Sequence, residues 1–254
     1  MALSSQSLFL YGLQVTEQNR SIDFVNTSGG PTIMATLNLG FYSGTTLVDE
    51  IERAMYAADP TNIYTASLDR TVSGGLQNRL TISTSGSFLS LLFGSGPRVA
   101  SSAATLIGFG LIDQTGATSY QGSTTIGTSL VPDLYGYTYL PPENYRKVFG
   151  SVNVSASGVK EAVVFQIQEF VQVNFMYEPK NKISPYWKPL IDWMIQQQPF
   201  EFTPEVSSPT VFYNVTLEKS EADGKGMALT MKEQLPKFPN FYTTGLLTMR
   251  LVPT

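Results

Sequence analysis

Residues 161–178 read EAVVFQIQEFVQVNFMYE, and this stretch decides the fold more than any other part of the chain. Its apolar side chains recur at every second position, which is the period of a β-strand with one face turned toward a core. Glu169 interrupts the apolar face, so we expect a bulge or bend there, which makes one long strand a corner between two sheets. The apolar residues of that face are Val163, Phe165, Ile167, Val171, Val173, Phe175 and Tyr177.

C-terminal to this stretch, a short helix and more strands are predicted. Apolar residues at helical spacing follow Pro189, which is acceptable in the first turn of a helix. Val211–Glu218 alternates again, and EADGKG at 221–226 has the composition of a hairpin turn. A last strand is expected at 242–252. Residues 150–254 are therefore predicted to form a β-sandwich with one covering helix.

The first half of the chain combines strands with one strong helix signal. Alternation predicts strands at Ser7–Val15 and Ile33–Leu39. GTTLVDEIERAMYAADP, residues 44–60, has apolar side chains at helical spacing, a capping-box pattern of Thr46 with Asp49, and a proline that stops the helix. The runs YTASLD and RLTIS flank a Gly-Gly loop and predict a hairpin. We expect a second, smaller α+β domain here, so the chain as a whole is predicted to be mainly β with two short helices.

The segment between the halves, 131–149, begins VPDLYGYTYLPPENY and is rich in proline and tyrosine. We interpret it as a connector between domains at 1–130 and 150–254. Tyrosine is enriched at protein interfaces, and an acid on an apolar face needs a partner. The alternative is a connector packed over its own domain, with Glu169 at a bulge that reaches water. The candidate interface residues are Tyr135, Tyr137, Tyr139, Tyr145 and Glu169.

Composition excludes several kinds of chemistry. The chain has 254 residues, no Cys and no His, so disulfides, thiolate nucleophiles and imidazole acid–base catalysis are ruled out. Only 14% of its residues are charged and the net charge is −4, which argues against sequence-specific nucleic-acid binding. No stretch approaches the ~20 apolar residues of a membrane span, so we expect no membrane insertion. Low charge is typical of proteins with extensive subunit contacts.

A search for catalytic and binding motifs finds little. Gly94-Ser95-Gly96 precedes a proline rather than a helix and is interpreted as a plain loop instead of a phosphate site. Glu201 and Glu205, with Asp192 nearby in sequence, are a possible carboxylate pair for polysaccharide hydrolysis, although solvated charges beside a helix end are the simpler interpretation. We therefore expect no catalytic residues, no cofactor and no metal.

One block of the first half resembles a known protein family. The order of the helix, YTASLD, RLTIS, FLSLLFGSG, SSAATLIGF and DQTGATSYQG, over 35–122, resembles a module of tailed-bacteriophage virion proteins. Residues 106–120 are the most specific part, and the second half resembles tail-tube and distal-tail β-sandwiches less specifically. The resemblance implies a structural subunit of a symmetric ring, often a hexamer, at the tail tip or baseplate. Its partners would be its own copies and other tail proteins.

The resemblance also implies where the protein is found: it would be made and assembled in the host cytoplasm and become part of the virion tail. The tyrosine-rich connector does not match the family pattern. A second hypothesis is therefore a receptor- or glycan-binding tail component, in which Tyr137 and Tyr139 stack on sugars.

Overall fold

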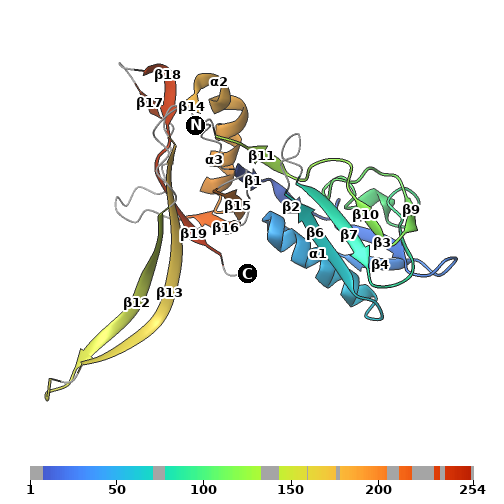
Figure 1. Ribbon diagram of the computed structural model, residues 1–254, viewed down its shortest axis with the longest axis horizontal. Helices are drawn as coiled ribbons and strands as arrows, with labels where there is room; N and C mark the ends of the chain where they lie inside the picture. The colour runs from blue at the N-terminus through green and yellow to red at the C-terminus, as the bar shows by residue number, and fades with distance from the viewer. Residues whose placement is uncertain are drawn as a thin grey trace, which may run out of the picture. The chain divides into compact units, whose positions relative to one another are not determined.

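The computed structural model is mainly β with two helical segments, which confirms the predicted fold class (Figure 1). The chain divides into two compact units. The first comprises Met1–Ser129 and Pro199–Phe212, and the second comprises Leu130–Gln198 and Tyr213–Thr254. The return of Pro199–Phe212 to the first unit is a feature that the sequence did not indicate. The structure describes residues 8–70, 78–132, 143–158, 160–175, 178–204, 212–218, 232–234 and 238–252.

Several small sheets build the first unit. A four-stranded sheet has the order β4-β3-β8-β9, a three-stranded sheet has the order β10-β7-β6, and the antiparallel pairs β2–β5 and β1–β15 complete it. The predicted hairpin of YTASLD with RLTIS is confirmed as β6 and β7, which pair from Tyr64↔Thr84 to Asp69↔Arg79. The strands are β1 (Leu8–Tyr11), β2 (Leu13–Val15), β3 (Ser21–Val25), β4 (Ile33–Thr36), β5 (Gly40–Tyr42), β6 (Tyr64–Asp69), β7 (Arg79–Thr84), β8 (Leu89–Leu91), β9 (Gln114–Ala117), β10 (Ser119–Gln121) and β15 (Phe200–Thr203). A 3₁₀ turn at Val99–Ser101 precedes β9, and β11 (Thr128–Leu130) lies where the chain passes into the second unit.

Helix α1 (Gly44–Ala58) forms where its apolar spacing predicts, and it packs against β4 and β6. Its cap differs from the prediction, because Ser43 rather than Thr46 is the N-cap. The Ser43 hydroxyl accepts from the Thr46 amide, and the Thr46 hydroxyl accepts from the Ser43 amide. These two bonds satisfy amides that a helix start leaves without partners. The buried side of α1 is formed by Leu47, Ile51, Ala54 and Met55.

The predicted strand Ser7–Val15 is two strands, because Gly12 breaks it. Gly12 has a φ of +84°, a left-handed conformation that glycine adopts more easily than other residues. As a result β1 pairs with β15 while β2 pairs with β5. One alternating run therefore serves two different sheets.

The second unit contains the long strand predicted from residues 161–178. Strand β13 lies between β12 and β19 in the order β16-β19-β13-β12, and a separate sheet has the order β14-β18-β17. A helical segment from Lys180 to Ile195 buries Trp187, Leu190 and Met194. The elements are β12 (Glu143–Val154), β13 (Lys160–Phe175), β14 (Glu178–Pro179), α2 (Lys180–Lys182), a π-helical turn (Ile183–Trp187), α3 (Lys188–Ile195), β16 (Tyr213–Leu217), β17 (Lys232–Gln234), β18 (Phe238–Thr243) and β19 (Gly245–Leu251).

The irregularity in β13 does not lie where the sequence predicted it. Glu169 pairs regularly with Arg146, and the register shifts between Phe149 and Gly150 instead, so that Phe165 has no partner in β12. A Cβ at Gly150 would lie 2.3 Å from the carbonyl oxygen of Val163, a distance that only glycine tolerates. The bulge therefore lies where Gly150 allows the two backbones to approach closely, and not at Glu169.

Strand β12 includes part of the predicted connector, residues 131–149. It begins at Glu143, so residues 143–149 belong to a hairpin with β13 and not to a segment without secondary structure. The pairing supplies partners for the backbone groups of these residues, which an isolated connector would leave to water.

Candidate functional site: a projecting hairpin

The hairpin of β12 and β13 extends past the strands beside it. Strand β19 pairs only with Phe170–Phe175 of β13, and β12 is the last strand of its sheet. In the described part of the chain, the hairpin from Arg146 to Glu169 therefore has no neighbouring strand on either edge. It appears in Figure 1 as the long two-stranded ribbon. We call residues 146–169 the arm.

Large apolar side chains on the arm are exposed to solvent. In the same strand Val171, Val173 and Phe175 are buried, so the change from buried to exposed occurs within a few residues. The prediction that Val163, Phe165 and Ile167 share a buried face with them is wrong, because nothing described covers the strand beyond Phe170. The most exposed are Phe165 (72%), Val154 (59%), Val148 (57%), Ile167 (56%) and Val164 (53%).

Register divides these side chains between the two faces of the arm. Residues paired across two strands lie on the same face, and successive residues of a strand alternate. Val148 pairs with Ile167 and Gly150 with Val164, and Val154 follows on the same side of β12. We call the face formed by Val148, Gly150, Val154, Val164 and Ile167 the apolar face; Lys160, which pairs with Val154, lies at its outer end.

The opposite face is more polar. It carries Phe149 paired with Gln166, Ser151 paired with Val163, and Lys147 paired with Gln168. The Lys147 amine lies 5.0 Å from the centre of the Phe149 ring, within the range of a cation–π contact. Amide groups and a covered ring make this face compatible with water, in contrast to the apolar face.

Charge at the base of the apolar face is neutralised within the arm. Arg146 and Glu169 lie opposite each other in the register, and the Arg146 Nε donates to Glu169 Oε1 at 2.7 Å. Residues 147–168 contain two lysines and one glutamate out of the 16 basic and 20 acidic residues of the chain. The arm beyond the ion pair is thus slightly basic, and the remaining residues are together acidic.

The predicted interface residues are only partly brought together. Glu169 lies on the arm, where its 45% exposed side chain pairs with Arg146 of its own chain, and its role as an interface residue stays a prediction. Tyr145 lies on β12 opposite Phe170, one residue before the arm. Tyr135, Tyr137 and Tyr139 lie outside the described residues.

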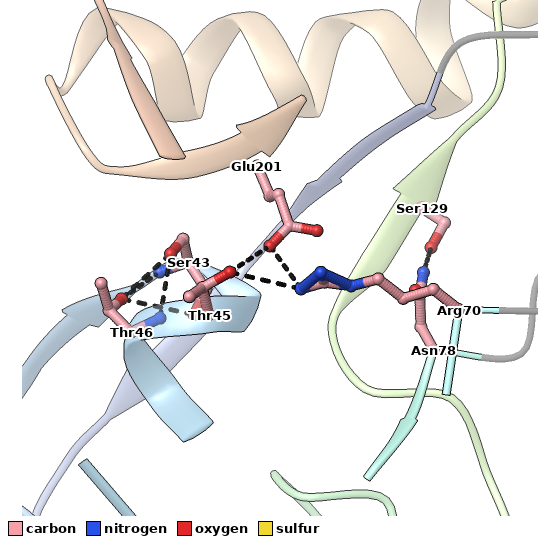
Figure 2. Close-up of polar contacts among 7 residues, drawn as sticks. All are labelled: Ser43, Thr45, Thr46, Arg70, Asn78, Ser129 and Glu201. Atoms are coloured by element: carbon pink, nitrogen blue, oxygen red, sulfur yellow. Dashed lines mark hydrogen bonds and ion pairs between the residues drawn. The ribbon is translucent and has the colours of Figure 1, made fainter. Parts of the chain in front are cut away.

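Glu201, the candidate hydrolytic acid, is part of a buried cluster in the first unit (Figure 2). Its Oε2 accepts from Arg70 Nη2 at 2.7 Å and from the Thr45 hydroxyl at 3.0 Å, and the Arg70 guanidinium lies 3.9 Å from the centre of the Phe212 ring. Burial raises the pKa of Glu201, and the charge of Arg70 and the hydrogen bond from Thr45 oppose that rise only in part. The cluster holds β15 against the first turn of α1.

The other members of the proposed carboxylate pair do not join this cluster in the described structure. Glu205 lies outside the described residues, and Asp192 is an exposed residue of α3 in the second unit. The pairing of acids therefore stays a prediction, and the simpler interpretation of solvated charges is wrong for Glu201, which is buried.

The Gly94–Gly96 loop uses its amides internally. Asp113 Oδ1 accepts from the backbone N–H groups of Gly94 at 2.7 Å and Ser95 at 3.0 Å, and its other oxygen accepts from the Ser95 hydroxyl. Although burial opposes the effect, these hydrogen bonds hold the pKa of Asp113 below its usual range. The amides that a phosphate would need are thus bonded to a carboxylate.

The described residues present neither a metal site nor a membrane-spanning helix. They include no group of three or more acidic side chains placed to hold a metal ion. No helix in the described ranges is long and apolar enough to cross a membrane.

Sequence reasoning missed the apolar face of the arm. An alternating apolar strand gives the same signal whether its apolar side meets its own core or a partner. A hint was available in the sequence. Residues 144–154 and 160–168 are strand-like runs on either side of a short Ser/Ala/Gly turn, and this pattern predicts a two-stranded hairpin.

Comparison with known proteins gives no family assignment. No protein-family model matches it, and no curated protein matches it.

Proposed function

We propose that the chain is an architectural subunit that assembles with its own copies into a ring in a bacteriophage tail, at the tail tip or baseplate. The observation that carries this proposal is the exposed apolar face of the arm. The resemblance of residues 35–122 to virion proteins supports the phage assignment, and the arm supports assembly. No catalytic role is part of the proposal.

The arm is unfavourable as a free surface. A two-stranded hairpin alone is marginally stable in water, and this one has five large apolar residues that are more than half exposed. Contiguous apolar surface of this kind marks interaction sites in soluble proteins. Two open strand edges add unpaired N–H and C=O groups, which also favour association. Covering the arm with another subunit removes both disadvantages at once.

Assembly is tested by changing the arm without changing its charge. In the variant Val164→Thr/Phe165→Thr/Ile167→Thr, each new side chain is polar and β-branched, so strand propensity is kept while apolar area is lost. We expect the wild-type chain to form a discrete oligomer and the variant to be mainly monomeric at the same concentration. Light scattering coupled to size-exclusion chromatography measures the mass of each.

A matched control is available in the first unit. Ile112 is 70% exposed, more than Ile167, but lies on a loop far from the arm in sequence. Ile112→Thr is expected to leave the oligomer intact. A wild-type chain that stays monomeric at all concentrations rejects assembly. Rings that form in solution but are missing from purified phage particles keep the architectural role and reject the tail assignment.

A further inference from the structure

We infer that the arm of one copy is seated, apolar face inward, on the body of a second copy, so that the contact is head-to-tail. Here the body is the chain outside residues 146–169. This inference rests on the proposed function and adds which surface meets which. The alternative is a two-fold contact in which two arms pair with each other, which joins two chains and by itself closes no ring.

The apolar face can lose its water at little electrostatic cost. Its one acid and one arginine, Glu169 and Arg146, already bond to each other at the base of the arm. Gly150 adds no side chain at the middle of the face, so a partner's side chain or backbone can approach closely there. Lys160, which pairs with Val154, is the one further charged residue on this face among the described residues, and it lies at the outer end of the arm, where its long side chain can keep the amine in water.

Interface size favours the body over a second arm. A stable interface involves roughly 20–30 residues from each partner. The five residues that define the apolar face fall short of this number, so two apolar faces that pack only on each other form a small contact. A surface of the body that also contacts both open edges involves more residues of the arm.

The distribution of charge also favours contact between an arm and the body of another copy. Residues 147–168 carry two basic residues and one acidic residue, and the rest of the chain carries 14 basic and 19 acidic residues. An arm is therefore attracted to the body of another copy and weakly repelled by another arm. Complementary charge selects partners and orientation, even where it adds little affinity.

Head-to-tail contact has a consequence for symmetry. Each copy provides one arm and one acceptor surface, so successive contacts close a ring or continue as a filament. A two-fold arm contact instead ends at a dimer. The two arrangements therefore differ in how a chain with a defective arm behaves.

Mixing wild-type chain with an arm-defective chain tests the inference. The Val164→Thr/Phe165→Thr/Ile167→Thr chain keeps its acceptor surface, so it binds a wild-type arm but extends the assembly no further. With a mass tag on one chain and about a tenfold excess of the variant, we expect native mass spectrometry to show most of the wild-type chain in two-chain species with one chain of each type, beside free variant monomer. Complete wild-type rings should fall at least tenfold.

The other outcomes separate the two proposals. Wild-type oligomers that form unchanged beside the variant show that a wild-type arm does not bind the body of the variant, and they overturn the inference alone. Oligomers of the variant that match the wild type remove the arm from the interface but leave assembly intact. A wild-type chain that stays monomeric overturns both, as does monomeric chain that binds vesicles of anionic phosphatidylglycerol through the arm. Matching unfolding curves of the variant and the wild type show that both chains are folded.

Discussion

Ile51 and Ile167 have the same side chain and opposite surroundings. Ile51 faces the core from α1 and is fully buried, whereas Ile167 faces water from the arm. The charged groups show the opposite distribution between the two regions. In the first unit Asp23, Asp59 and Glu201 are buried and each has specific partners, while the arm has a solvent-exposed ion pair. The first unit thus pairs these buried acids within the chain, and we propose that the arm is completed by a partner.

Loss of a buried ion-pair partner should have the largest effect on stability. Arg98 donates to Asp23 Oδ1, to the Thr36 hydroxyl and to the Ala35 carbonyl, and the Asp23 side chain is almost inaccessible. Arg98→Met leaves the Asp23 carboxylate buried without its cation, which should lower the free energy of unfolding by about 3–5 kcal/mol. Chemical denaturation measures this change.

The matched variant lies on the arm. Arg146→Met removes the cation of an exposed pair, and the expected loss is about 0–1 kcal/mol. Equal losses for Arg98→Met and Arg146→Met would contradict the contrast between the first unit and the arm.

Substitution of Ile51 or Ile167 by alanine should give almost as large a difference in the free energy of unfolding between the core and the arm. Ile51→Ala opens a cavity under α1 and is expected to lower the free energy of unfolding by about 2–5 kcal/mol. Ile167→Ala removes a side chain that is in water and should change it by about 0.5 kcal/mol or less in the monomer. Urea unfolding at a protein concentration too low for assembly measures both. A loss above about 2 kcal/mol for Ile167→Ala would mean that the arm packs against its own chain.

Asp59 should make the first unit sensitive to acid. Asp59 is the residue that follows α1, and its carboxylate accepts hydrogen bonds from Asn26, Thr61, Asn62 and Tyr64. Burial raises the pKa of this carboxyl, but the hydrogen bonds outweigh burial and lower the pKa well below 3.8. Because the folded pKa is the lower one, the stabilisation is present above the unfolded pKa and is lost as pH falls. Asp59→Asn should lower the free energy of unfolding by about 1–3 kcal/mol near neutral pH. The difference in this free energy between the variant and the wild type should become smaller toward about pH 3. A gap that does not change with pH would contradict this account.

Glu201 should show the opposite pH dependence and the smallest effect. Its pKa is raised by burial, so the folded state binds a proton more tightly than the unfolded state. Stability linked to this group is therefore greatest below the unfolded pKa and is lost as pH rises through the folded pKa. Relative to Glu201→Gln, the wild-type chain should gain stability from about pH 7 to about pH 4. Denaturation curves at both pH values test the sign, and a relative loss would refute it.

Local periodicity predicted the parts of the fold that depend on nearby residues. The spacing of Leu47, Ile51 and Met55 predicts α1, and alternation predicts β6, β7 and β13. The split at Gly12 and the bulge opposite Gly150 depend on backbone conformation and on the approach of another strand, which a sequence pattern does not encode.

The candidate site was harder to predict for a related reason. Alternation marks Val163, Phe165 and Ile167 as apolar, but it does not say whether their own chain covers them. The partners of Glu201 were equally hidden, because Thr45 and Arg70 are more than a hundred residues away in sequence. Interactions between distant residues decide which apolar face remains exposed.

Hydrogen–deuterium exchange of the arm, followed across a range of protein concentrations, tests most directly whether the arm is covered by another copy. The account predicts that backbone amides of β12 and β13 within residues 146–169 exchange rapidly in dilute protein and are protected once oligomers form, while α1 amides exchange slowly throughout. Arm amides that exchange equally fast in monomer and oligomer would contradict it.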